Sequence, residues 1–481
     1  MSLYLGLDAG GSSIKGVLAD RDGQVLAMQR IPYETMHPAT GWAEQDAEYW
    51  WEATRSILGH FVEKCPSMKT ELAGIMVSGM VPNLVPVDED GQVVRPAILY
   101  RDNRAVDECK MLQERFGLHF LMQDVIPKWI WLRDHEPEHF KRTRLLLGTH
   151  AFLAYRLTGN PNIDADTAGL YGHSSFDAES GWNETLFRKL NLPASVLPPH
   201  YLPTEAVGYV REQWKKEFGI EGDIPVYAGA GDSLAAILGT GAVHKGDGMI
   251  YLGTAATMWV LEEELSHMAR KLIFGSNRLH FVSNVLAGGD SVKWVQALMQ
   301  ISDAELEALE EAARRIPAGS DGLMFLPHLL GIRTPVPNAM ARGSVLGLSA
   351  GHTPAHFYRA LLEGVAYSLY QGYEASHRKA ERLLITGGGA QCSLWRDIVA
   401  NVFRLPVEYY EKSDGALGLA YFAAYAREDF SDFSRLESWL GSSITVMPDS
   451  ANSECYKREY ARYGQLDQAM MESYPILVQE E

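Results

Sequence analysis

A strand-like segment that ends in a turn of small residues occurs twice in the chain, and this repeat constrains the fold more than any other feature. The first copy is Leu5-Gly6-Leu7-Asp8-Ala9-Gly10-Gly11-Ser12-Ser13, and the second, in outline, is Gly248-Met249-Ile250-Tyr251-Leu252-Gly253-Thr254-Ala255-Ala256-Thr257. Each turn is typical of a hairpin, because glycine adopts the backbone conformations that tight turns require. One such hairpin in each half of the chain predicts a duplicated architecture.

The segments around the first copy alternate between strand-like and helix-like patterns. Residues 3–20 predict two strands around the glycine turn, and a third at 24–29 follows Asp22-Gly23. Helical periodicity over Ala47–Glu63 precedes short apolar runs at 72–77 and 84–87. Strands that alternate with amphipathic helices predict an α/β layer architecture.

The length of 481 residues is that of about two domains. The composition changes near residues 219–253, where a strand-like run leads through Gly229-Ala230-Gly231-Asp232 into Gly239-Thr240-Gly241. We therefore predict a boundary near residue 246, which divides the chain into domains 1–246 and 247–481.

The charge of the chain disfavours two classes of partner. It has 43 basic and 61 acidic side chains, which gives a formal net charge of −18. A negative field repels phosphate backbones and anionic lipid, so we expect neither nucleic-acid binding nor membrane binding as the main activity. A small-molecule substrate remains.

The cysteines and the amino-terminal residues indicate a cytoplasmic location. Four cysteines lie far apart in the sequence and form no C-x-x-C pair, which fits a reducing compartment. The first residues lack the pattern of a signal peptide, and no apolar run reaches the roughly 18 to 20 residues of a spanning helix.

The first small-residue turn has the composition of a phosphate-binding loop. Glycine lets backbone N–H groups approach phosphate oxygens, and Asp8 adds a carboxylate for a hard cation such as Mg²⁺. A structural hairpin with a capping aspartate would have the same composition. Both interpretations stay open for this segment alone.

Two further small-residue turns follow strand-like runs. At Asp232 a helix amino terminus would keep the carboxylate ionised and able to accept a proton from an alcohol, although a simple N-cap is the alternative. Leu234 stands where a dinucleotide fingerprint would have its third glycine. Gly387-Gly388-Gly389 would form a flat surface for a purine, or only a tight connection.

One segment matches the sequence of a zinc-binding motif but not the helical structure that the motif requires. His135-Glu136-Pro137-Glu138-His139 matches H-E-x-x-H, which requires both histidines on one face of a continuous helix. Proline in a helix interior removes a hydrogen bond and clashes with the preceding turn. We therefore predict a helix that starts after Glu136, and no zinc site.

Taken together, the motifs resemble those of the FGGY carbohydrate kinases, which include xylulokinases and glycerol kinases, over nearly the whole chain. The match is specific because many separate motifs occur in the family's order. They are Gly6 to Lys15, Gly41 to Asp46, Tyr100 to Ala105, Tyr155 to Gly159, the Asp232 turn, Gly253-Thr254, Arg333-Thr334-Pro335, Ala341-Arg342-Gly343, Glu363-Gly364 and Gly387 to Gly389.

The resemblance implies a fold, a reaction and a set of site residues. The fold would be two actin-like, ribonuclease-H-like domains with ATP and a sugar meeting in an interdomain cleft. Asp232 would be the general base, and Asp8 would hold Mg²⁺ together with Asp232. The phosphates would contact Gly10, Gly11, Ser12, Ser13, Gly253 and Thr254, the adenosine Gly289, Gly387, Gly388, Gly389 and Ala390, and the sugar Ser78, Met80, Asp102 and Asp232.

The expected sugar pocket departs from the better-known relatives. Met80-Val81-Pro82-Asn83 replaces more polar runs, Ser233 follows Asp232 in place of an amide, and Tyr100 and Ile332 replace Trp and Glu. These changes leave the substrate open among ketoses such as xylulose and polyols. Two other functions also remain: an actin-like nucleotide or sugar sensor without efficient phosphoryl transfer, and a kinase of a non-sugar alcohol. A homodimer is one assembly that the sequence allows.

Overall fold

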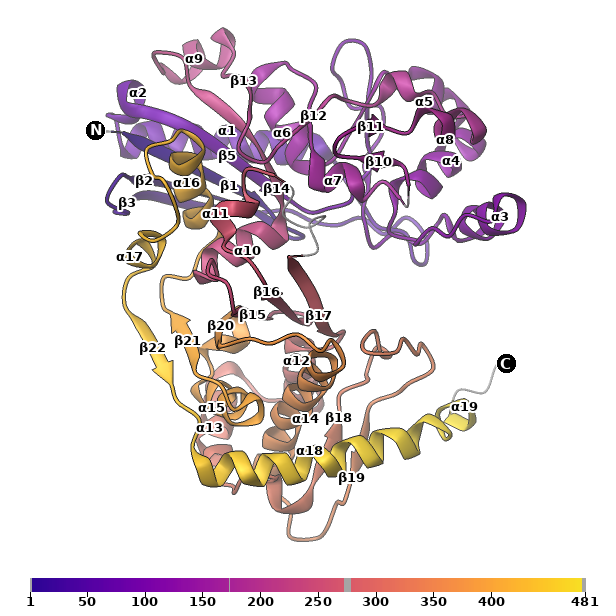
Figure 1. The fold of residues 1–481 in the computed structure, drawn as a ribbon, viewed down its shortest axis with the longest axis vertical. Coiled ribbons are helices and arrows are strands. Elements are labelled where there is room, and N and C mark those ends of the chain that lie inside the picture. The colour runs from indigo at the N-terminus through magenta and orange to yellow at the C-terminus, as the bar shows by residue number, and fades with distance from the viewer. Residues whose placement is uncertain (1, 173, 272–277, 478–481) are drawn as a thin grey trace. The chain divides into compact units, whose positions relative to one another are not determined.

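The computed structural model describes residues 2–172, 174–271 and 278–477 (Figure 1). Its contacts divide the chain into two compact units. The first contains residues 1–241, 265–277 and 414–440, and the second contains residues 242–264, 278–413 and 441–481. The chain therefore returns to the first unit twice after residue 246. Each unit is described by itself.

The first unit is built on a six-stranded sheet in the order β13-β14-β5-β1-β2-β3. The three central strands β14, β5 and β1 are parallel, and the remaining neighbours are antiparallel. The strands are β1 (Leu3–Ala9), β2 (Ser13–Asp20), β3 (Val25–Pro32), β5 (Leu72–Gly79), β13 (Ala206–Tyr209) and β14 (Pro225–Gly231).

Helices α1 and α16 cover opposite faces of this sheet. A side chain at Gly6 would place its Cβ 1.9 Å from the carbonyl oxygen of Ala416 in α16, whereas one at Gly16 would meet Ile57 of α1 at 2.5 Å. Gly16 pairs with Leu7, and successive residues of a strand point to opposite faces. Asp8, two residues after Gly6, therefore lies on the face that α16 covers.

The helix predicted near the start of the first unit is present in the structure. The helix predicted over Ala47–Glu63 is confirmed as α1, with Asp46 as its N-cap. The helices are α1 (Ala47–Lys64), α2 (Met68–Glu71), α3 (Val106–Phe116), α4 (Val125–His135), α5 (Pro137–Arg142), α6 (Thr149–Thr158), α7 (Ala165–Gly169), α8 (Glu184–Lys189), α9 (Glu212–Phe218), α10 (Asp232–Thr240), α11 (Leu265–Met268), α16 (Gly415–Ala426) and α17 (Leu436–Leu440), with the 3₁₀ turn η1 (Ala194–Val196).

Short strands join the connecting segments of this unit. They are β4 (Glu44–Gln45), β6 (Val85–Val87), β7 (Ala97–Ile98), β8 (Leu145–Leu147), β9 (Ile163–Asp164), β10 (Phe176–Asp177), β11 (Gly181–Trp182) and β12 (His200–Tyr201). The helix predicted to start after Glu136 is confirmed as α5, so His135 ends one helix and His139 belongs to the next.

The second unit has a six-stranded sheet in the order β17-β16-β15-β20-β21-β22. Strands β15, β20 and β21 are parallel, and the other neighbours are antiparallel. The strands are β15 (Asp247–Leu252), β16 (Ala256–Leu261), β17 (Leu279–Val285), β20 (Arg382–Thr386), β21 (Val407–Tyr410) and β22 (Ser443–Val446), with the separate pair β18 (Met324–Leu326) and β19 (Ser344–Leu346).

The two sheets have the same topology. Written from the hairpin edge, the first runs β3-β2-β1-β5-β14-β13 and the second β17-β16-β15-β20-β21-β22. Both begin with three antiparallel strands, continue through two parallel neighbours and end with an antiparallel edge strand. The duplicated architecture predicted from the repeated strand and turn is confirmed, because β15 occupies the place of β1.

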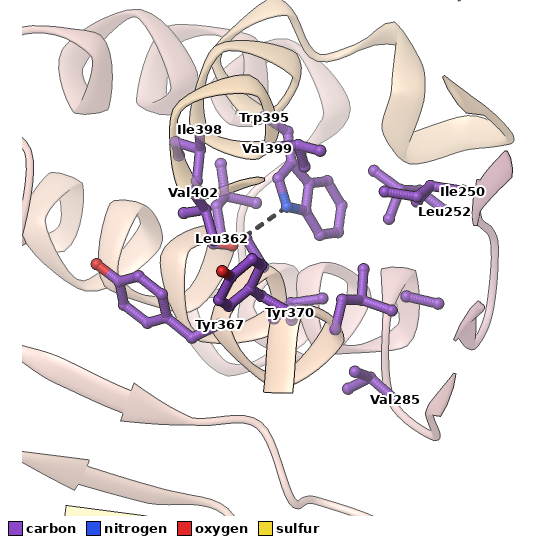
Figure 2. Packing of buried hydrophobic residues seen from close by; sticks show 14 of the residues in the cluster. Ile250, Leu252, Val285, Leu362, Tyr367, Tyr370, Trp395, Ile398, Val399 and Val402 are labelled. Carbon is purple, nitrogen blue, oxygen red and sulfur yellow. Dashed lines mark hydrogen bonds between the residues drawn. The ribbon is translucent and has the colours of Figure 1, made fainter. Parts of the chain in front are cut away.

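The core of the second unit lies around the helices α14 and α15. Figure 2 shows Trp395 of α15 packed near Leu362, Val399 and Ile250, with its indole N–H donating to the Leu362 carbonyl at 3.2 Å. The helices are α12 (Gly289–Met299), α13 (Asp303–Arg314), α14 (Pro354–Ala375), α15 (Ser393–Phe403), α18 (Ser450–Met471) and α19 (Tyr474–Leu477), with the 3₁₀ turns η2 (Ser320–Gly322) and η3 (Gly388–Gln391). Across the described ranges, none of the helices combines the length and the apolar character needed to cross a membrane.

Candidate functional site

Three strand ends meet at one edge of the first sheet. The register places Ala9 beside Gly79 and Gly79 beside Gly231, so the parallel strands β1, β5 and β14 end in one row. In open α/β sheets, ligands bind outside the carboxyl ends of the strands. Asp8, Ser78, Met80, Asp232 and the turn at residues 10–13 all lie at or next to this edge.

Asp232 is the first residue of α10, and Gly231 is the N-cap. The N-cap alternative for Asp232 is therefore wrong, and its carboxylate lies within the first turn of the helix. The side chain is partly buried. Burial raises the pKa of Asp232 to about 6, against the opposing effects of the Ser233 N–H, the His150 charge and its own N–H.

Asp8 belongs to a cluster of carboxylates with one lysine. Lys15 pairs with Asp8 in the β1–β2 register and donates to Asp414 Oδ2, and Asp414 caps α16 through the N–H of Ala416. A Cβ at Gly415 would lie 3.2 Å from Asp8 Oδ2. Burial raises the pKa of Asp8 to about 7, and the charges of Asp232 and Asp414 add to the rise.

This cluster fits a divalent cation. Asp8 Oδ1 is buried and has no hydrogen-bond partner among the described residues. Three carboxylates around one lysine leave excess negative charge, which a cation would neutralise. No group of three or more His, Cys, Asp and Glu side chains within the described ranges could hold a metal by itself. Mg²⁺ usually takes only one or two carboxylates and keeps several waters, so Asp8 and Asp232 suffice.

The turn at residues 10–13 is held from its flanks. The Gly10 N–H donates to the Ser13 carbonyl at 3.0 Å, and Gln45 Nε2 donates to the Gly11 carbonyl at 2.9 Å. Gly11 and Ser12 are exposed, whereas Ser13 is buried and its Oγ accepts from Arg30 Nε at 2.7 Å. Gly11 and Ser12 therefore present the open part of the predicted phosphate turn.

The predicted sugar residues have different environments. Ser78 and Met80 are buried beside Asp8 and Ala9, and the Met80 N–H donates to the Ala9 carbonyl. Asp102 is 1% exposed and accepts from the Ala43 N–H and three donors of Arg104. These four hydrogen bonds occupy about all the acceptor sites of a carboxylate. A sugar contact of Asp102 stays a prediction, and in this structure the residue stabilises its loop.

The second unit collects the predicted nucleotide residues at the equivalent edge. Tyr251 pairs with Thr386, so the turns that follow β15 and β20 are neighbours. The Gly289 N–H donates to the Gly253 carbonyl at 2.7 Å and brings the start of α12 to the same place. Gly253, Thr254, Gly289, Gly388 and Gly389 line one pocket of about 610 Å³.

The other two predicted residues support this pocket without lining it. Ala390 is buried in η3, and Gly387 adopts a φ of 95° directly after β20. A Cβ at Gly387 would lie 2.5 Å from the Leu252 carbonyl oxygen, whereas the Cβ position of Gly388 has no other described atom within 4 Å. Gly387 therefore allows the close packing of two strand ends, and Gly388 leaves an open backbone surface.

The variants Gly387→Ala and Gly388→Ala should separate these two roles. Gly387→Ala is expected to lower the free energy of unfolding by about 2 kcal/mol or more, because alanine meets both a strained φ and a backbone clash. Gly388→Ala should leave stability within about 0.5 kcal/mol and weaken nucleotide binding. Chemical unfolding and nucleotide titration measure the two effects. Equal stability of both variants would contradict the assigned role of Gly387.

Two members of this charge cluster, Lys15 and Asp414, were not predicted as site residues from the sequence. Lys15 lies in the first motif, but a lysine in a strand has no pattern that marks it. Asp414 directly precedes an apolar helical run, as Asp232 does, but it lacks the Gly229-Ala230-Gly231 turn for which Asp232 was selected. The aspartate before an apolar helix was the one available signal for Asp414.

Comparison with known proteins agrees with this arrangement. Residues 3–239 match the model of the N-terminal domain of the FGGY family of carbohydrate kinases, and residues 234–427 match its C-terminal domain. The chain is 29% identical to a xylulose kinase of Staphylococcus xylosus over 95% of this chain and 98% of that protein.

Two further relatives extend the comparison. A xylulose kinase of Lactococcus lactis is 30% identical, with 88% of each chain covered. The crystal structure of a xylulose kinase from Rhodospirillum rubrum superposes with a TM-score of 0.87 at 27% identity, over 98% of this chain and 99% of that one.

Proposed function

Because the chain belongs to the FGGY family of carbohydrate kinases, we propose that it transfers the terminal phosphoryl group of ATP to a primary hydroxyl of a small neutral ketose, such as xylulose, or a polyol. The observation that carries the proposal is the Asp232 carboxylate, which lies partly buried at the end of β14 in the same charge cluster as Asp8. The names of the xylulose kinase relatives support the choice of substrate class.

Asp232 is suited to accept the proton of the substrate hydroxyl. A pKa of about 6 leaves this carboxylate mostly ionised at neutral pH, and a general base works best with a pKa near the operating pH. Its place in the first turn of α10 brings the positive end of the helix dipole to the ionised form.

The remaining residues position the reactants. Phosphoryl transfer depends mainly on alignment and on neutralisation of charge. The N–H groups near Gly11, Ser12 and Thr254 would hold phosphate oxygens, and Gly388 and Gly389 would lie against the nucleoside. Mg²⁺ bound by Asp8 and Asp232 would supply positive charge to the phosphates.

The polar groups near the substrate also support a small neutral acceptor. Met80 is 1% exposed and fills a place beside the first turn, and Asp102 is saturated by Arg104 and Ala43. Met80 and the saturated Asp102 therefore supply no positive charge for an anionic substrate, and the cluster around Asp8 has excess negative charge. A ketose or polyol needs only hydrogen bonds.

Release of ADP with a panel of acceptors tests the function. We expect one ketose or polyol to stimulate ADP release by at least about 10²-fold over the rate with water alone, since a positioned acceptor gains from proximity. The panel should include ketopentoses, pentitols, aldoses, glycerol and hydroxy acids. Stimulation only by glycerol or a hydroxy acid would favour a kinase of a non-sugar alcohol, and none at all would favour a sensor.

A further inference from the structure

The pocket of the second unit has an acidic wall. It extends from the Gly253-Thr254 turn to helix α13, which contributes Leu306, Glu307 and Glu310 to the lining. Lys293 is the cation of the lining, and it pairs with Asp290 at 3.2 Å. The wall formed by α13 therefore presents carboxylate oxygens, which accept hydrogen bonds and cannot donate them when ionised.

Glu310 is held by Tyr358 and lies close to Cys392. Its Oε1 accepts from the Tyr358 hydroxyl at 2.9 Å, and Tyr358 is buried in α14. Burial and the nearby Glu310 charge raise the pKa of the Cys392 thiol to about 12, so the carboxylate lies close to this lining residue as well. A carboxylate has about four acceptor sites, and one hydrogen bond from Tyr358 leaves capacity for a ligand.

The purine bases differ in what they offer to such a group. Adenine carries a 6-amino group, which donates, whereas a 6-oxopurine carries an acceptor at the same place. Two acceptors that face each other in a confined pocket repel and lose their hydration without compensation. An acceptor that is fixed by a buried tyrosine and faces position 6, not the N1–H donor of a 6-oxopurine, would therefore discriminate between the two bases.

We propose that Glu310 is a specificity-determining residue that accepts a hydrogen bond from the 6-amino group of the nucleotide base, and that it selects ATP over 6-oxopurine nucleotides. The proposal rests on the proposed function in that this pocket holds the nucleotide. Gly388 and Gly389 line the same pocket and provide the flat backbone surface against which a base can lie.

Binding of ATP and of inosine triphosphate (ITP) to the full chain without a sugar tests the proposal by calorimetry. The wild type should bind ATP more tightly than ITP by roughly 10-fold or more, as expected for one hydrogen bond to a charged group. Glu310→Gln should lower the affinity for ATP and raise that for ITP, because the glutamine amide can donate to the 6-oxo group. The ratio of the two affinities should fall to within about threefold of unity.

Two further variants separate base recognition from support of the fold. Glu311→Gln makes the same change on the next residue of α13, which is exposed and does not line the pocket. Its ratio of ATP affinity to ITP affinity should therefore match that of the wild type. Tyr358→Phe removes the partner of Glu310 and should reduce the ratio only in part. Equal loss of ATP and ITP affinity in Glu310→Gln would make Glu310 a structural residue and overturn the proposal.

The outcomes also distinguish this inference from the proposed function. A wild type that binds ATP and ITP equally, yet phosphorylates a sugar with ATP, overturns the role of Glu310 alone. A chain that shows the predicted binding ratios and phosphorylates nothing overturns the proposed function and leaves base selection intact.

Discussion

Asp232→Asn is expected to lower the turnover number by about 10²- to 10⁴-fold, the usual cost of removing a general base. Asparagine has nearly the same shape but cannot take the proton of the substrate hydroxyl. The residues proposed to contact the nucleoside belong to the second unit, whereas Asp232 belongs to the first, so the affinity for ATP measured without Mg²⁺ should change little. Single-turnover kinetics and nucleotide titration measure the two quantities.

The control for this variant is Asp223→Asn. Asp223 is exposed in the segment before β14 and undergoes the same change of charge. Its variant should retain wild-type turnover. If Asp232→Asn also retained it, Asp232 would have no part in proton transfer and the proposed mechanism would be wrong.

Asp8→Asn is expected to stabilise the protein while it removes most of the activity. The pKa of Asp8 is raised from 3.8 to about 7, so the ionised carboxylate destabilises the folded state. This penalty is absent below the unfolded pKa, grows as the pH rises and is complete above the folded pKa. In EDTA at pH 8 the variant should melt about 5 °C higher, allowing for partial exposure of the group.

The pH dependence makes this prediction specific. The gain in melting temperature should shrink as the pH falls from 8 to 5 and disappear below the unfolded pKa of 3.8, where wild-type Asp8 is protonated in both states. Turnover with Mg²⁺ should fall by at least about 10²-fold, as for the loss of one group that stabilises transition-state charge. If Asp8→Asn were no more stable than the wild type at pH 8, the ionised Asp8 carboxylate would not destabilise the folded state, and the prediction would be wrong.

The control for Asp8→Asn is Asp22→Asn. Asp22 is exposed in the turn between β2 and β3. The Asp22→Asn variant should melt within about 1 °C of the wild type at pH 8 and at pH 5, as expected for an exposed surface substitution. A similar rise in both variants would indicate a general effect of net charge.

Local patterns predicted the elements around the site closely. The first hairpin and the strand after it were predicted over residues 3–20 and 24–29, and the structure has β1 to β3 over Leu3–Ala9, Ser13–Asp20 and Val25–Pro32. Helix α1 agrees within one residue because Asp46 caps its start and its apolar positions repeat with the helical period. The repeated strand and turn likewise predicted a duplicated architecture, which the shared topology of the two sheets confirms.

The environment of single side chains could not be predicted in the same way. Asp102 was selected as a sugar residue from its motif, but Arg104 and the Ala43 N–H occupy its oxygens. Helix α16 begins at Gly415, yet it packs on β1, and this brings Asp414 to Lys15 across 399 positions. No local period carries information about such a contact.

The sequence by itself determined the kind of fold, the strand ends and the aspartates that follow or precede them, because strands, helices and turns respond to neighbours a few residues away. The tertiary structure decided which carboxylates share one environment, which are already saturated, and which glycines line a pocket. Those properties depend on burial and on the summed charge of distant segments, and both arise only when the sheets and the helices have packed.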